Sequence, residues 1–124
     1  MTVEPEQQEV PPQRVAELMV AGDAQVVDVR TDDEHAAGHV GGAEHIPFDE
    51  LPSRAGELDQ ARPVVFYCQS GGRSSSAAQA FGASGWEAYT MAGGLEQWAQ
   101  SGLPLEPDGG EVTHLSGLPD APAA

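Results

Sequence analysis

The segment Cys68-Gln69-Ser70-Gly71-Gly72-Arg73-Ser74 holds the residues best suited to chemistry. Two adjacent glycines let a backbone curl so that successive N–H groups point inward, and such a concavity at a helix N-terminus attracts negative charge. It should favour the thiolate of Cys68, the reactive form of cysteine. Arg73 adds a permanent cation whose forked donors suit an oxyanion. The combination indicates a nucleophilic cysteine that attacks an anionic substrate.

Packing is the alternative role for this cysteine. A lone cysteine at the end of a strand is commonly buried as a small apolar residue. Two glycines followed by a serine also form an ordinary strand-to-helix turn. Cysteine, paired glycines and arginine within six residues, between a predicted strand and a predicted helix, favour the functional interpretation.

The elements around this loop predict an α/β fold. Val64–Tyr67 consists of four β-forming residues that are apolar on both faces, as in a buried parallel strand. Ligands bind at the carboxyl ends of such strands. Further strands are predicted at Gln25–Val29 and Glu87–Met91, with a brief extended piece containing Pro47 at His45–Phe48. Helical segments are predicted from Pro12 to Gly22, over 32–37, from Asp49 to about Leu58, over Ser74–Ala83 with a serine cap, and over Leu95–Ser101. This alternation predicts one parallel sheet with helices on both faces.

Composition restricts the partners. The chain has 124 residues, with 20 Asp and Glu against 5 Lys and Arg, a formal charge of −15, and every one of the five basic residues is arginine. The length suits one domain. So acidic a chain argues against binding to nucleic acid or anionic membranes, which need basic contacts. The sequence starts with no signal-peptide pattern and holds no membrane-length apolar run, so a cytoplasmic location is expected. Solubility, adaptation to salt and docking to a basic partner all remain open as reasons for the acidity.

The chain divides into three parts by composition. Residues 1–9 are predicted to be a polar lead-in and residues 10–106 the folded domain. Residues 107–124 are predicted to be an extended tail rich in Pro, Gly and Ala, with Val112 and Leu115 as its anchors.

Three stretches together resemble the rhodanese-like, single-domain sulfurtransferase family over roughly residues 10–106. Their order and spacing agree with the family's signatures. The first stretch is Val27-Asp28-Val29-Arg30 with Glu34, Gly38-His39-Val40, Gly42-Ala43 and Ile46-Pro47; the second is the loop from Cys68 to Ser74; the third is Ala92-Gly93-Gly94 with Trp98 and Gly102-Leu103-Pro104. The resemblance implies a three-layer α/β fold with a five-stranded, mainly parallel sheet and helices on both faces.

Loop length distinguishes the chemistries within this resemblance. Four residues separate Cys68 from Arg73, as in the sulfurtransferases, whereas the related cell-cycle phosphatases and arsenate reductases have one residue more. Tyr67 precedes the cysteine, where the phosphatases usually have histidine. Both features favour sulfur over phosphate or arsenate.

The resemblance implies a thiosulfate sulfurtransferase of the rhodanese type that needs no cofactor. Cys68 would take sulfur from a small anionic donor such as thiosulfate and become a persulfide. The substrate-binding residues would be Gln69, Ser70, Gly71, Gly72, Arg73 and Ser74, with Arg73 on the departing sulfite and with Gln69 and Ser70 as exposed side chains. The acceptor would be cyanide or a thiol, including a thiol of a sulfur-relay protein. A non-enzymatic sulfur carrier or interaction module with the same fold remains an alternative.

Four further polar residues are expected to support the site rather than to react. They are Asp28, Arg30, Glu34 and His39. A metal site built from His35, His39 and His45 is not expected, because no cysteine lies near them in the sequence.

Overall fold

A parallel β-sheet organises the computed structural model, which describes residues 8–107. The features predicted for residues 1–7 and 108–124, the tail with Val112 and Leu115 among them, lie outside the described residues. Five strands are hydrogen-bonded in the order β1-β5-β4-β2-β3, and every pair is parallel. The strands are β1 (Glu9–Val10), β2 (Gln25–Asp28), β3 (Glu44–His45), β4 (Val64–Tyr67) and β5 (Ala88–Met91). The predicted α/β fold is therefore confirmed.

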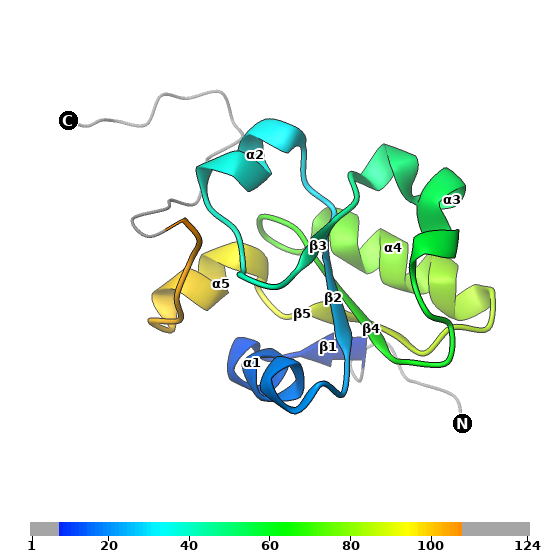
Figure 1. Ribbon diagram of the computed structural model, residues 1–124, viewed down its shortest axis with the longest axis horizontal. Coiled ribbons are helices and arrows are strands. Elements are labelled where there is room, and N and C mark those ends of the chain that lie inside the picture. The colour runs from blue at the N-terminus through cyan, green and yellow to red at the C-terminus, as the bar shows by residue number, and fades with distance from the viewer. Residues whose placement is uncertain (1–7, 108–124) are drawn as a thin grey trace.

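Helices cover both faces of the sheet (Figure 1). They are α1 (Pro12–Ala21), α2 (Asp32–Ala37), α3 (Leu51–Arg54), α4 (Gly72–Ala83) and α5 (Gly94–Gln100), with 3₁₀ turns η2 (Phe48–Glu50) and η3 (Ala55–Glu57) beside α3. Val27 and Phe66 join the core cluster under α3 and α4. Their neighbours Val26 and Val65 join the opposite cluster under α1 and α5. This alternation follows from the period of two along a strand, and burial on both faces explains why β4 is apolar throughout.

Strand register brings the chemically interesting segments together. Asp28 is the last residue of β2 and pairs with Tyr67, the last residue of β4. The loops that follow both strands therefore leave the same edge of the sheet, side by side. One of them begins at Cys68, and the other leads through Arg30 into α2.

Three segments differ from the sequence-based expectation. The extended piece predicted at His45–Phe48 is shifted towards the N-terminus: strand β3 is Glu44–His45, and Phe48 already begins η2, because Pro47 has no N–H group with which to continue the strand. β1 has only two residues, too few to show a pattern, and it exists because Val10 and Glu9 pair with β5 at the sheet edge. The helix predicted from Asp49 to about Leu58 is instead three short turns, η2, α3 and η3. Pro52 lacks an N–H group and Gly56 disfavours helix, which explains the interruption.

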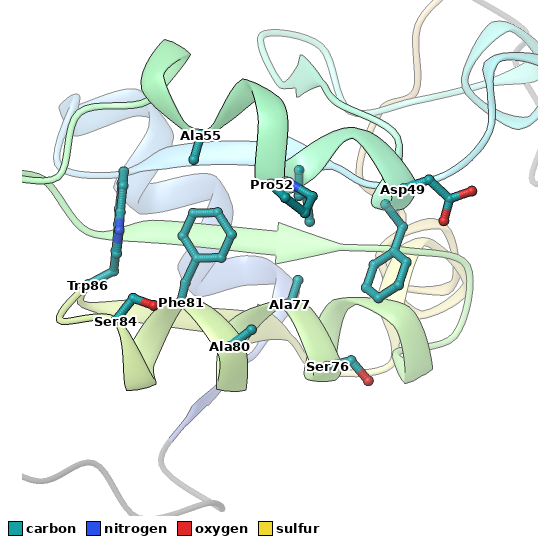
Figure 2. A pocket seen from close by; sticks show the side chains of 11 residues that line it. Asp49, Pro52, Ala55, Ser76, Ala77, Ala80, Phe81, Ser84 and Trp86 are labelled. Atoms are coloured by element: carbon teal, nitrogen blue, oxygen red, sulfur yellow. The ribbon is translucent and has the colours of Figure 1, made fainter.

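An apolar groove of about 560 Å³ runs between α3 and α4 (Figure 2). Aromatic contacts form one end of it: the ring of Phe81 lies edge-on to Phe66 at 4.9 Å and to Trp86 at 5.0 Å. Small side chains, Ala77 and Ala80, line the α4 wall and leave the space open. The contacts of the Phe81 ring therefore hold the carboxyl-terminal half of α4 against the sheet. Within residues 8–107, no helix is long and apolar enough to cross a membrane.

Candidate active site

The cysteine loop is tighter than the sequence suggests. Cys68 follows β4 directly, and α4 begins at Gly72 rather than at the predicted Ser74. The N-cap residue is Gly71 with φ of +123°, and no side chain caps the helix. A φ in this region favours glycine, which explains why the turn can be made there. The predicted serine cap is wrong because the hydroxyl of Ser74 lies inside the site.

Backbone N–H groups surround the sulfur of Cys68. The N–H of Gly71 donates to Sγ at 3.1 Å, and the N–H of Ser74 donates at 3.4 Å. The hydroxyl of Ser74 lies 3.5 Å from the same sulfur. Cys68 is only 2% exposed, so these donors act on a largely dehydrated atom. The arrangement at the first turn of a 12-residue helix suits a negatively charged sulfur.

Helix α5 supports the loop from behind. The N–H of Leu95 donates to the carbonyl of Cys68 at 2.9 Å, and the N–H of Glu96 donates to that of Gln69 at 3.1 Å. A Cβ atom at Gly94 would lie 2.5 Å from the Gln69 oxygen and 2.7 Å from the Cys68 oxygen. Gly94 also has φ of +64°. Only glycine therefore allows α5 to approach the two carbonyl groups so closely.

Arg73 is paired with Glu34 across the site. Its Nη1 and Nη2 donate to the two carboxylate oxygens of Glu34 at 2.9 and 3.1 Å. The Glu34 side chain is 2% exposed and that of Arg73 is 29% exposed. Burial raises the pKa of Glu34, but the hydrogen bonds from Arg73 and Thr31 outweigh it and hold this pKa below its ordinary value. The ion pair ties α2 to the first turn of α4.

A second, fully buried ion pair lies behind the loop. Arg30 donates from Nε and Nη2 to the carboxylate of Asp28 at 2.9 and 2.8 Å, and both side chains have no exposed surface. The hydroxyl of Tyr67 donates to Asp28 at 3.1 Å and accepts the N–H of Val40 at 3.0 Å. Burial raises the pKa of Asp28, but the hydrogen bonds from Arg30 and His35 and the charge of Arg30 together have the larger effect. The carboxyl pKa therefore lies below its ordinary value. This network fixes the end of β2 against β4.

Three histidine rings stack beside this network. The ring of His35 is stacked against both others: its centroid lies 3.8 Å from that of His39 and 4.2 Å from that of His45. His35 Nδ1 contacts Asp28 at 2.8 Å. His39 is also bridged through its backbone to Glu106. The contacts that His39 makes within residues 8–107 are thus with α2 and the end of the described chain. No set of His, Cys, Asp and Glu side chains in this part of the chain is arranged to hold a metal ion.

The structure brings most of the predicted site residues together. Cys68, Gly71, Arg73 and Ser74 form the loop and the first turn of α4, and Glu34 joins them through Arg73. The side chain of Gln69, expected to be exposed, is buried, with 6% of the residue exposed, whereas Ser70 is exposed as expected.

Sequence reasoning missed one residue of the site, Thr90. Its hydroxyl lies 2.6 Å from that of Ser74. In the sequence it is an ordinary β-forming residue of a predicted strand, 16 positions from Ser74, so no local signal identifies it.

Comparison with known proteins identifies the family of this chain. The family model for the rhodanese-like domain matches residues 11–101. The thiosulfate sulfurtransferase GlpE of Pseudomonas aeruginosa is 35% identical over 106 residues, which are 85% of this chain and 94% of that protein. The uncharacterized protein YqhL of Bacillus subtilis is 41% identical over 76 residues, and the match spans 60% of each chain.

A solved structure shows the same architecture. The crystal structure of a rhodanese-related protein from Thermoplasma volcanium has a TM-score of 0.73 at 23% identity and covers 79% of this chain and 96% of that chain. At this identity the likeness shows the fold alone. The matched family model and the sequence relatives together establish that the chain belongs to the rhodanese-like domain family, which includes named sulfurtransferases.

Proposed function

We propose that this protein is a sulfurtransferase that moves sulfane sulfur from thiosulfate to a nucleophilic acceptor through a persulfide on Cys68. The observation that carries the proposal is the sulfur of Cys68 with the N–H groups of Gly71 and Ser74 at 3.1 and 3.4 Å. Relatives named sulfurtransferase support the reaction class. Thiosulfate as donor is our extension to this chain.

The first half-reaction loads the cysteine. The Cys68 thiolate attacks the outer sulfur of thiosulfate, a new S–S bond forms, and the bond between the two thiosulfate sulfurs breaks. Its electron pair leaves with sulfite, so the negative charge of the thiolate passes to the outer sulfur of the persulfide. The loop N–H groups then face a bound sulfur anion, for which backbone donors at a helix N-terminus are suited.

The second half-reaction discharges the persulfide. An acceptor, either cyanide or the thiolate of a small molecule or a sulfur-relay protein, attacks the outer sulfur. The S–S bond to Cys68 breaks, and its electron pair returns to Sγ as the thiolate. Cys68 is the single cysteine of the sequence, so no internal thiol competes and the acceptor must come from outside.

Arg73 keeps enough donors to act on sulfite. A guanidinium has five N–H donors, and Glu34 takes two of them. Within residues 8–107, Glu34 is the only hydrogen-bond partner of this guanidinium, and the side chain is 29% exposed, so the other three donors could bind the oxygens of the leaving group. Glu34 would thereby orient Arg73, while Asp28 and Arg30 would hold the end of β2 beside the loop. His39 would support α2, and none of these side chains would touch the sulfur.

The proposed unit is the domain from residue 10 to residue 106, with Gln69, Ser70 and Gly72 completing the substrate-binding loop. A reduced thiol is required for loading, which fits a reducing compartment such as the cytoplasm. No cofactor enters either half-reaction.

Intact mass spectrometry tests the proposal directly. The reduced protein is incubated with thiosulfate and then with cyanide, alongside Cys68→Ser as the matched control. A gain of one sulfur atom that cyanide removes, and that the variant lacks, supports the two half-reactions.

Two other results would point elsewhere. Sulfur uptake from a cysteine-desulfurase persulfide but not from thiosulfate would indicate a sulfur carrier with a protein donor. Turnover of a phosphate ester or of arsenate without any sulfur uptake would overturn the sulfurtransferase assignment.

A further inference from the structure

The hydroxyl of Thr90 belongs to the hydrogen-bond network around the reactive sulfur. Thr90 lies on β5 and is 3% exposed, and Ser74 is fully buried. Their hydroxyl oxygens are 2.6 Å apart. Ser74 Oγ is in turn 3.5 Å from Cys68 Sγ and 3.3 Å from the carbonyl oxygen of Gly71. The Ser74 hydroxyl therefore connects Thr90 to two possible acceptors, the sulfur of Cys68 and the carbonyl oxygen of Gly71.

Counting protons fixes the direction of the bond between the two hydroxyls. Within residues 8–107, Ser74 Oγ is the only hydrogen-bond partner of the Thr90 hydroxyl. If Ser74 donated to Thr90, the buried Thr90 proton would have no acceptor there, which is unfavourable. If Thr90 donates to Ser74, both protons are satisfied, because the Ser74 proton can reach Sγ or the Gly71 carbonyl.

We infer that Thr90 is a positioning residue of the sulfur-transfer reaction. By donating to the Ser74 hydroxyl, Thr90 keeps that hydroxyl a donor, and its acceptor changes with the charge on Cys68. When Sγ is a thiolate, the Ser74 proton points at the sulfur, since a charged acceptor binds it more strongly than a carbonyl. When Sγ is the neutral inner sulfur of a persulfide, the proton returns to Gly71. Donation from Thr90 also polarises the Ser74 hydroxyl and strengthens its bond to the anion.

The effect on the two half-reactions differs, and this part rests on the proposed function. In discharge, Sγ becomes the leaving group and gains the electron pair of the broken S–S bond, so the Ser74 proton stabilises it. In loading, Sγ loses charge, so the same bond is weakened in the transition state. Thr90 should therefore matter more for release of sulfur to the acceptor than for its uptake.

Alkylation of Cys68 by iodoacetamide across pH tests the inference without any sulfur donor. For Ser74→Ala we expect the midpoint of the alkylation profile to move about one pH unit upwards, and persulfide discharge by cyanide to slow about tenfold. Thr90→Val should produce smaller changes in the same direction, about threefold in discharge. Thr90→Ser keeps the hydroxyl and should restore the wild-type profile.

The charged groups that face the cysteine are unchanged in these variants. They are Arg73 on α4 and, through it, Glu34 on α2. Tyr89→Phe is the matched control, because it removes a hydroxyl from the same strand that bonds only to Glu87 among the described residues. Its alkylation profile should equal that of the wild type.

A double-mutant cycle separates positioning from general damage. If Thr90 acts through Ser74, Thr90→Val should add nothing in the Ser74→Ala background. A wild-type profile for Thr90→Val, or an effect that adds in full to that of Ser74→Ala, overturns the inference. Should Thr90→Val not fold, Thr90→Ala removes the same hydroxyl without adding bulk and repeats the test. If thiosulfate proves not to be the donor, the alkylation results still decide the role of Thr90.

Discussion

Replacing Gly94 by alanine tests whether α5 holds the cysteine loop from behind. The added Cβ would lie 2.5 Å from the Gln69 carbonyl oxygen and 2.7 Å from that of Cys68, both backbone atoms that cannot rotate away. Either the loop or the first turn of α5 must therefore shift. Because the N–H groups of Leu95 and Glu96 bond to the same two carbonyls, a shift also weakens these hydrogen bonds.

The magnitude follows from two separable contributions. An alanine at a positive φ costs about 1–2 kcal/mol in the folded state, offset in part by about 0.4–1 kcal/mol from the stiffer unfolded chain. Overpacking against the backbone adds about 1–3 kcal/mol. We therefore expect Gly94→Ala to lower the free energy of unfolding by about 2–4 kcal/mol.

Gly22 provides a matched control for the first contribution. Its φ of +73° is close to the +64° of Gly94, but a Cβ there would meet no atom within 4 Å. Gly22→Ala should cost only the backbone strain, about 1 kcal/mol. Urea unfolding of both variants gives the difference between their free energies of unfolding. The rate of sulfur uptake from thiosulfate shows whether the cysteine loop has moved. We expect slower uptake only in Gly94→Ala.

Equal losses of stability in the two variants would refute the reasoning, since the close approach of α5 to the loop would then contribute nothing. A large loss of stability in Gly94→Ala with an unchanged rate of sulfur uptake would contradict the expectation that the cysteine loop moves. In that case the added methyl group displaces α5 and leaves the loop in place.

Three further perturbations have expected outcomes. Glu34→Gln should lower the free energy of unfolding by about 1–2 kcal/mol, because Arg73 loses a charged acceptor but stays partly hydrated. Urea unfolding measures the stability and thiosulfate incubation the rate of sulfur uptake, and a variant unchanged in both would contradict the expectation. Asp28→Asn should cost more, about 3–5 kcal/mol, because it leaves the Arg30 charge buried and uncompensated; a loss below that of Glu34→Gln in the same unfolding assay would contradict it. Burial lowers the pKa of His35, opposed by Asp28, so the unfolded state binds more protons below about pH 6.5 and stability should fall as the pH drops from 7 to 5. His35→Gln should flatten that slope in unfolding curves recorded across this range, and an unchanged slope would assign it to other groups.

Some of the sequence-based expectations depend on local pattern alone. Val64–Tyr67 is a strand at the predicted residues, and α4 follows a loop rich in glycine, with only its start displaced by two residues. The helix predicted from Asp49 is wrong because Pro52 and Gly56 interrupt it, so the segment forms three short turns. Strand β1 could not be predicted, since two residues carry no period and only their pairing with β5 makes them a strand.

The sequence by itself determined the tight glycine turn after Cys68 and the family, and it predicts Cys68 as the nucleophile, because these depend on residue types at short spacing. Tertiary structure alone decided that Glu34 pairs with Arg73, 39 residues away, and that Thr90 reaches Ser74. Parallel strands place distant segments side by side at one edge of the sheet, and pairing there depends on register and on the order of the strands. Nothing in the local sequence around Thr90 or Glu34 encodes that order, so the contacts of Thr90 with Ser74 and of Glu34 with Arg73 form only when the sheet has formed.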